Sequence, residues 1–151
     1  MDAVTYPDPE VISFISETLI PLRVTSDTKP LSEVFNVKWT PTLITLSPEG
    51  IEHHRTLGFL EPKDLIASLL LGKGKYLFDS EKFPEALITL EIIISDYKHT
   101  HAVPEAIYLR GVSQYKNTGD PAPLKAAYEL LSNDFPKGEW TQRAYPYRLI
   151  G

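Results

Sequence analysis

The side chains best suited to metal binding are four histidines, which form two close pairs. His53 and His54 are adjacent, and a single residue separates His99 from His101. Neutral imidazole is a common ligand of transition metals. Adjacent residues of a strand point to opposite faces of a sheet, so the first pair cannot chelate one ion. The second pair stands in an expected loop between helices with only two carboxylates nearby, and we therefore expect no metal site.

The sequence also gives little support for a catalytic nucleophile or a phosphate-binding loop. The chain has no cysteine, which excludes disulfides, thiolate zinc sites and a cysteine nucleophile. Gly72–Lys75 reads Gly-Lys-Gly-Lys, but it follows an expected helix and lacks the Ser or Thr of a phosphate-binding loop, so a hinge or small packing positions are the better interpretation. Carboxylate pairs such as Asp79 and Glu81 stand in expected turns, as solvated charges do. The sequence predicts no catalytic residue and no cofactor.

Composition and charge narrow the class of protein. The chain has 151 residues, of which 42% are hydrophobic and 23% charged, as in a folded globular protein. Its net charge of -5, without a dense basic cluster, argues against a nucleic-acid partner. The longest apolar stretch, Leu65–Leu71, is far shorter than the roughly 20 residues of a membrane-spanning helix. No basic and apolar leader follows Met1, so we expect no membrane partner and a cytoplasmic location.

The elements that must position any site fall into two parts, residues 1–72 and 73–151. The first part mixes helical and strand periods, and prolines open its helices. We expect, in order, a helix at Pro9–Thr18, a strand at Leu19–Val24, a short helix from Pro30 to Asn36, strands at Thr42–Leu46 and Ile51–Leu57, and a helix from Glu61. Ser47–Gly50 has Pro at its second and Gly at its fourth position, which predicts a tight turn and a hairpin.

The second part shows the helical period throughout and contains an internal repeat. Its helices are separated by breaks at Ser80–Phe83, His99–Val103, Asn117–Pro123 and Pro136–Glu139. A shift of 38 residues superposes residues of similar size. The superposed pairs are Leu77 with Tyr115, Leu90 with Tyr128, Ile93 with Leu131, Asp96 with Asp134, Tyr97 with Phe135 and Ala106 with Ala144.

This repeat resembles the tetratricopeptide family. The matching small and large positions are Gly74, Leu77, Ala86 and Leu90 in the first unit and Gly111 and Tyr115 in the second. The match is loose, because the family's usual period is about 34 residues and because Asp120–Pro123 adds loop to the second unit. The resemblance implies stacked helical hairpins with a concave surface for a partner protein. The alternative is an unrelated helical bundle.

A second resemblance covers roughly residues 6–72. The segment Val37–Thr42 reads Val-Lys-Trp-Thr-Pro-Thr and is followed by an apolar strand, a Pro-Glu-Gly turn, a strand ending at Gly58 and a helix. This order resembles the second half of the thioredoxin fold. The resemblance implies that Pro41 is a cis-proline, whereas the alternative is an ordinary trans-proline at the start of a strand. The expected fold class is α/β plus all-α: an incomplete thioredoxin-like domain over 1–72, then tetratricopeptide-like hairpins over 73–151.

The chain departs from the thioredoxin family in lacking its CxxC motif. In the family that motif stands at the start of the helix that here begins near Pro9, so we expect it to lie before Met1. The strands that precede it in the family are absent as well, which would leave Leu19–Val24 without partners on both sides. We therefore expect either strand exchange or a homodimer through the exposed sheet edge, or a poorly ordered N-terminal segment.

Two functions from different classes follow from the resemblances. As a non-catalytic protein-binding module, the chain would bind a protein or peptide through Trp39, Thr40 and Pro41, because in the family the residue before the cis-proline offers its main chain to an extended peptide. The alternative is the inactive remainder of a thiol-disulfide oxidoreductase whose CxxC lies upstream of Met1, since no residue here supplies a thiolate. A purely structural scaffold is a third possibility.

Overall fold

The computed structural model describes residues 1–151 and combines seven α-helices with one two-stranded sheet. The mixed composition of helices and strands expected from the sequence is thus confirmed. The elements are α1 (Pro9–Thr18), α2 (Leu31–Val34), β1 (Thr42–Leu46), β2 (Glu52–Leu57), α3 (Pro62–Asp79), α4 (Phe83–Asp96), α5 (Val103–Thr118), α6 (Ala122–Asp134), α7 (Glu139–Ala144) and the 3-10 helix η1 (Tyr145–Leu149).

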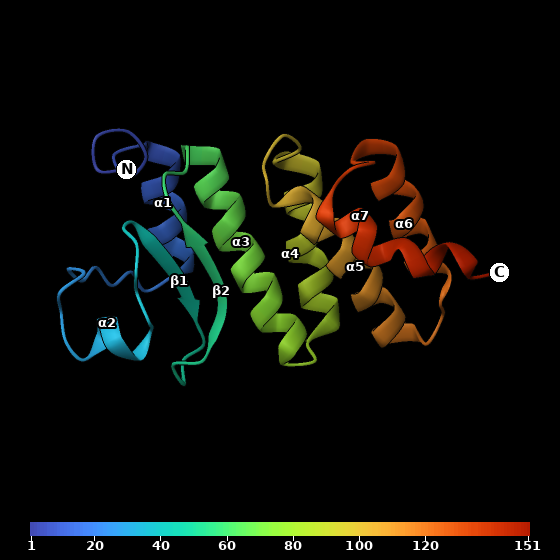
Figure 1. Ribbon diagram of the computed structural model, residues 1–151, viewed down its shortest axis with the longest axis horizontal. Helices are drawn as coiled ribbons and strands as arrows, with labels where there is room; N and C mark the ends of the chain where they lie inside the picture. Colours follow the sequence, from blue (N-terminus) through green and yellow to red (C-terminus); the bar gives the residue numbers. More distant parts are fainter.

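These elements follow one another along the long axis of the molecule (Figure 1). The hairpin, α1 and α2 lie at the N-terminal end, helices α3 to α6 stand side by side along the rest of the axis, and α7 with η1 runs across α5 and α6 toward the C-terminus. Both β1 and β2 contact α3, and α1 contacts α3 as well. Helix α3 is therefore the element against which the N-terminal part is assembled.

The hairpin has the expected strands and turn. Antiparallel pairing joins Leu43 to Thr56 and Thr45 to His54, with one irregularity in the register after Thr45. The turn is closed by the Ser47 N–H, which donates to the Ile51 carbonyl at 2.8 Å, and Gly50 adopts the positive φ of 82° that glycine tolerates best. The face that carries Leu43, Thr45, His54 and Thr56 is turned toward α3.

Helix α3 runs without a break across residue 72. Gly72 lies directly under the hairpin, where an added Cβ would come within 2.8 Å of the Thr45 Cβ, and Gly74 lies against Leu90 of α4. Both glycines are small packing positions, one of the two interpretations that the sequence left open. The same helix thus packs against the sheet on one side and against α4 on the other.

Enlarging Gly72 should loosen the hairpin from α3. We expect Gly72→Val to lower the free energy of unfolding by about 1–3 kcal/mol, because the new side chain would overlap Thr45 of β1. Urea unfolding measures this change. Lys73→Val is the matched control, since it puts the same side chain at the neighbouring exposed position. Equal losses in the two variants would contradict the close contact.

The 38-residue repeat of the sequence appears in the geometry of two successive helical hairpins, α3–α4 and α5–α6. Tyr97 and Phe135 are the residues that cap the C-termini of α4 and α6, and their N–H groups bond to the carbonyls of Ile93 and Leu131. Ile93 and Leu131 are both fully buried. These two superposed pairs therefore share positions and roles, whereas Leu77 is buried and its counterpart Tyr115 is exposed.

A single hydrophobic core joins the two parts of the chain. It contains 15 buried residues from α1, α3, α4, α5, α6, α7 and the turn before α5, and none from the strands. Leu43 of β1 and Phe14 of α1 pack against it from the N-terminal side. The sheet is consequently a peripheral layer on a helical core.

One expected element is missing, because Leu19–Val24 forms no strand. Leu19 at the end of α1 has extended backbone angles, and residues 20–24 belong to no helix or strand and make no backbone hydrogen bond. A strand requires a neighbour, and nothing in this chain pairs with the segment. Residues 1–7, for which poor order was one of the expected alternatives, form turns, and the buried Thr5 hydroxyl donates to the Leu60 carbonyl at 2.6 Å.

Candidate peptide-binding site

Trp39, Thr40 and Pro41 end the loop that connects α2 to β1. We call Val37–Pro41 the proline loop. The peptide bond between Thr40 and Pro41 is cis, as the resemblance to thioredoxins implied. Pro41 is tied to the hairpin, because its carbonyl accepts a hydrogen bond from the Gly58 N–H at 2.9 Å. Trp39 is 66% exposed, although exposing a large apolar ring to water is unfavourable.

The proline loop borders an open depression of about 460 Å³. Trp39 and Thr40 line it together with Ser26, Val37 and Lys38, whereas Pro41 does not. Two of the three site residues expected from the sequence, Trp39 and Thr40, thus line one concave surface. Val37 and Lys38 could have been anticipated as neighbours of Trp39, but Ser26 comes from a loop without periodicity and carried no signal in the sequence.

The main chain at Thr40 is free. Neither its N–H nor its carbonyl takes part in an intramolecular backbone hydrogen bond, and the residue is exposed. The carbonyl of Trp39, by contrast, is occupied by the Thr42 hydroxyl, which donates to it at 2.5 Å. Free main-chain groups next to an exposed aromatic ring are the features needed to bind an extended segment by strand addition.

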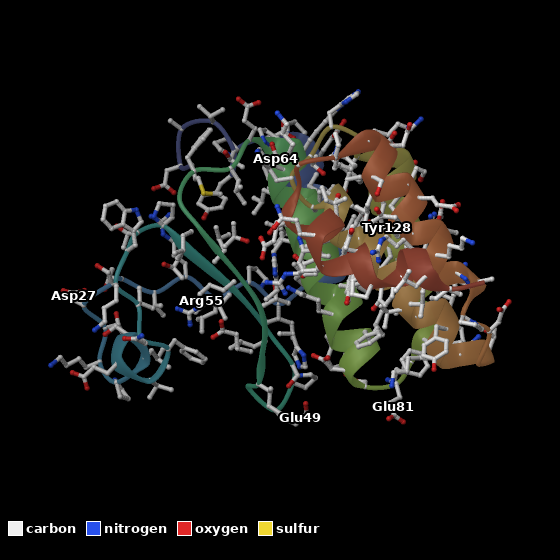
Figure 2. All side chains as sticks on the ribbon, turned by 45° about the vertical axis from the view of Figure 1, so that its right-hand side comes forward. Asp27, Glu49, Arg55, Asp64, Glu81 and Tyr128 are labelled. Atoms are coloured by element: carbon white, nitrogen blue, oxygen red, sulfur yellow. The ribbon has the colours of Figure 1, made fainter.

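Arg55 of β2 holds the segment before the proline loop in place. Its guanidinium donates to the carbonyl of Phe35 at 2.6 Å and to both carboxylate oxygens of Glu52 at 2.7 Å. The hydrogen bond from Arg55 lowers the pKa of Glu52. Figure 2 shows Arg55 between the hairpin and α2. The loop is therefore anchored at Phe35 on one side and at Pro41 on the other.

A second polar cluster lies between the hairpin and the helices. His54 Nε2 is 3.0 Å from the hydroxyl of Ser68, and the Lys75 ammonium donates to His54 Nδ1 at 3.3 Å. Lys75 also forms an ion pair with Glu105 of α5 at 2.5 Å. The Thr56 hydroxyl completes the cluster at 2.7 Å from that of Ser68. The cluster connects β2, α3 and α5 through side chains.

This cluster does not activate a nucleophile. An ammonium group only donates hydrogen bonds, so Nδ1 of His54 must accept and Nε2 must carry the proton that faces Ser68. An imidazole with its proton on that side cannot take the proton of the serine hydroxyl. Burial, reinforced by the positive charge of Lys75, lowers the pKa of His54 to about 4. The imidazole is therefore neutral near pH 7 and acts as a structural hydrogen-bonding group.

The remaining histidines each face one carboxylate. His53 Nδ1 lies 2.6 Å from Asp79, and His101 Nδ1 lies 3.2 Å from Asp64 at the top of α3 in Figure 2. No group of three or more His, Asp or Glu side chains is placed to hold a metal ion. His53 and His54 have separate partners, but both side chains contact α3, so the expected opposite faces are not observed. The reason is the irregularity in the register, where His53 has no partner in β1 and its ring packs against Tyr76 of α3.

None of the helices combines the length and the apolar character that crossing a membrane requires. Comparisons with protein-family models, with curated proteins and with solved structures find no match.

Proposed function

We propose that the chain is a non-catalytic protein-binding module that takes up an extended polypeptide at the proline loop. The observation that carries this proposal is the free main chain of Thr40 beside the exposed ring of Trp39 at an open depression. A bound segment would exchange backbone hydrogen bonds with Thr40, and Trp39 would cover it with apolar surface. Affinity would come mainly from the main chain, so one site could accept many sequences.

The fold around the site is consistent with this proposal. The hairpin that follows Pro41 and the helix after the hairpin support a thioredoxin-like N-terminal part. The hairpins α3–α4 and α5–α6, which repeat at an offset of 38 residues, support a tetratricopeptide-like C-terminal part. Helical hairpins of that kind bind proteins through their surfaces, so the second part would add a second contact with the same partner.

Removal of the Trp39 ring tests the proposal. We expect Trp39→Ala to weaken binding of a reduced, carboxymethylated lactalbumin chain at least tenfold, about 1.4 kcal/mol, because an aromatic anchor is lost. Calorimetric titration measures the affinity. Trp39 is largely exposed, so the free energy of unfolding should change little.

Tyr145→Ala is the matched control, since it removes an exposed aromatic ring of η1 at the opposite end of the molecule. The control should bind the lactalbumin chain as the wild type does. Equal affinities for Trp39→Ala and Tyr145→Ala would contradict the proposal. A loss of stability in Trp39→Ala without a loss of affinity would instead indicate a structural scaffold.

A further inference from the structure

We propose that two copies of this chain pair reciprocally, with residues 20–24 of each copy forming a strand along the free edge of β1 in the other. The two halves of this contact are both present in one chain, and they do not pair with each other there. The proposal concerns β1 and the segment after α1, and it does not rest on peptide binding at the proline loop.

The free edge of β1 follows from the register of the hairpin. The Gly58 N–H bonds to the Pro41 carbonyl, and in an antiparallel pair the residues that bond to the partner alternate along the strand. Leu43 and Thr45 therefore direct their N–H and carbonyl groups toward β2. The main-chain groups of the three alternate residues point the opposite way, and no intramolecular backbone bond uses them; these residues are Thr42, Ile44 and Leu46.

Nothing in the sequence of β1 protects this edge. The strand reads Thr-Leu-Ile-Thr-Leu, without a charge or a proline. Monomeric proteins usually guard an edge strand with lysine, proline or a covering segment, because exposed N–H and carbonyl groups recruit other strands. An unguarded edge of this kind is a surface for strand pairing.

The segment after α1 has the matching properties. Ile20, Leu22 and Val24 alternate with Pro21 and Arg23 and are 99%, 80% and 48% exposed. None of the residues 20–24 makes a backbone hydrogen bond. Three large apolar side chains so exposed in a segment outside any helix or strand indicate a segment that is buried in its working state.

Pro21 fixes which side of this segment can pair. Residues with even numbers share one hydrogen-bonding direction in an extended chain, and Pro21 lies on the other. The three even residues each keep an N–H and a carbonyl for a partner, whereas the side that lacks the proline N–H would face solvent. Proline occurs in strands at that kind of edge position. The even residues of the segment therefore complement the even residues of β1, three against three.

A second copy is the occupant that satisfies both surfaces together. Within one chain the segment does not reach β1: the Leu19 N–H still bonds to Ile15 of α1, and the exposed Arg23 side chain lies 2.9 Å from Asp2 at the N-terminus. A two-fold arrangement uses each free edge and each free segment once and leaves neither unpaired. A foreign strand would cover only the edge and would leave Ile20 and Leu22 exposed.

The double variant Ile20→Lys/Leu22→Lys tests this pairing, because both side chains are exposed in the monomer and would be buried in the dimer. Sedimentation equilibrium of the purified full chain should give twice the monomer mass of 17.0 kDa for the wild type. The double variant should have half the wild-type mass. The control Ile88→Lys, on the exposed face of α4, should keep the wild-type mass.

Hydrogen exchange supplies the second measurement. In the dimer we expect the amides of Leu22 and Ile44 to be protected together, and in the double variant both should exchange as unpaired groups. A wild-type mass of 17.0 kDa at all concentrations would overturn the proposal. If the two amides were protected in such a monomer, the segment and β1 would pair within one chain. Trp39→Ala should leave the mass unchanged, so failure of this proposal and failure of peptide binding are separate results.

Discussion

Replacement of Leu131 by alanine is expected to lower the free energy of unfolding by about 2–5 kcal/mol. Leu131 is fully buried in α6 and belongs to the core that joins all the larger helices. Truncation removes apolar contacts and leaves a cavity that the neighbouring helices cannot fill completely. Ile93 occupies the corresponding position of the preceding hairpin and is also fully buried, so Ile93→Ala should cost a similar amount.

Urea unfolding followed by circular dichroism measures both losses. Ile92→Ala is the matched control, because Ile92 neighbours Ile93 on α4 but is 37% exposed, and its truncation should cost clearly less. The single core further predicts that Leu131→Ala and Gly72→Val shift one and the same transition. Two separate transitions, or equal losses for Ile92→Ala and Ile93→Ala, would contradict this description of the core.

The second large effect is a loss of folding stability in mild acid, caused by protonation of His54. Its pKa is about 4 in the folded chain, below the ordinary value of 6.5, mainly because burial disfavours the charged imidazolium. The unfolded chain therefore binds the proton more tightly than the folded chain does. The contribution of His54 to stability is complete above pH 6.5 and declines as the pH falls toward 4. The full loss amounts to up to about 3 kcal/mol.

Unfolding free energies measured between pH 7 and pH 4 test this effect. His54→Asn keeps a polar side chain without the titration, so the fall of stability over this range should be much shallower in the variant. The lowered pKa of Glu52 adds a separate loss, but only as the pH falls below its ordinary value of 4.5. Parallel pH profiles for the wild type and His54→Asn would show that His54 is not the group responsible.

Local chemistry explains which elements the sequence could reveal. Asp8 caps the helix that begins at Pro9, and its carboxylate accepts hydrogen bonds from the N–H groups of Glu10 and Val11. The turn at Ser47–Gly50 has residues that favour its geometry in any context. Helices and a hairpin specified by such short-range signals were predicted close to their observed bounds. A strand is different, because Leu19–Val24 has the composition of a strand but needs a neighbour to become one.

The candidate site was predictable to a similar extent. Trp39, Thr40 and Pro41 are contiguous, so one motif was enough to place them in one loop, and two of them line the depression. The contributions of Ser26 and Arg55 depend on how distant segments meet, which no local pattern contains. The cluster around His54 was missed for the same reason, because its members come from β2, α3 and α5.

Because α3 is unbroken across residue 72, the hairpin and the helices α4 to α6 are joined without a flexible linker. A flexible linker would let a bound polypeptide take many orientations relative to the helical hairpins. A continuous helix instead fixes the orientation of the two ends of the molecule. A segment held at Trp39 would therefore leave the site in one fixed direction relative to α4, α5 and α6. Binding at both parts of the chain would therefore depend on the orientation of the partner as well as on its presence.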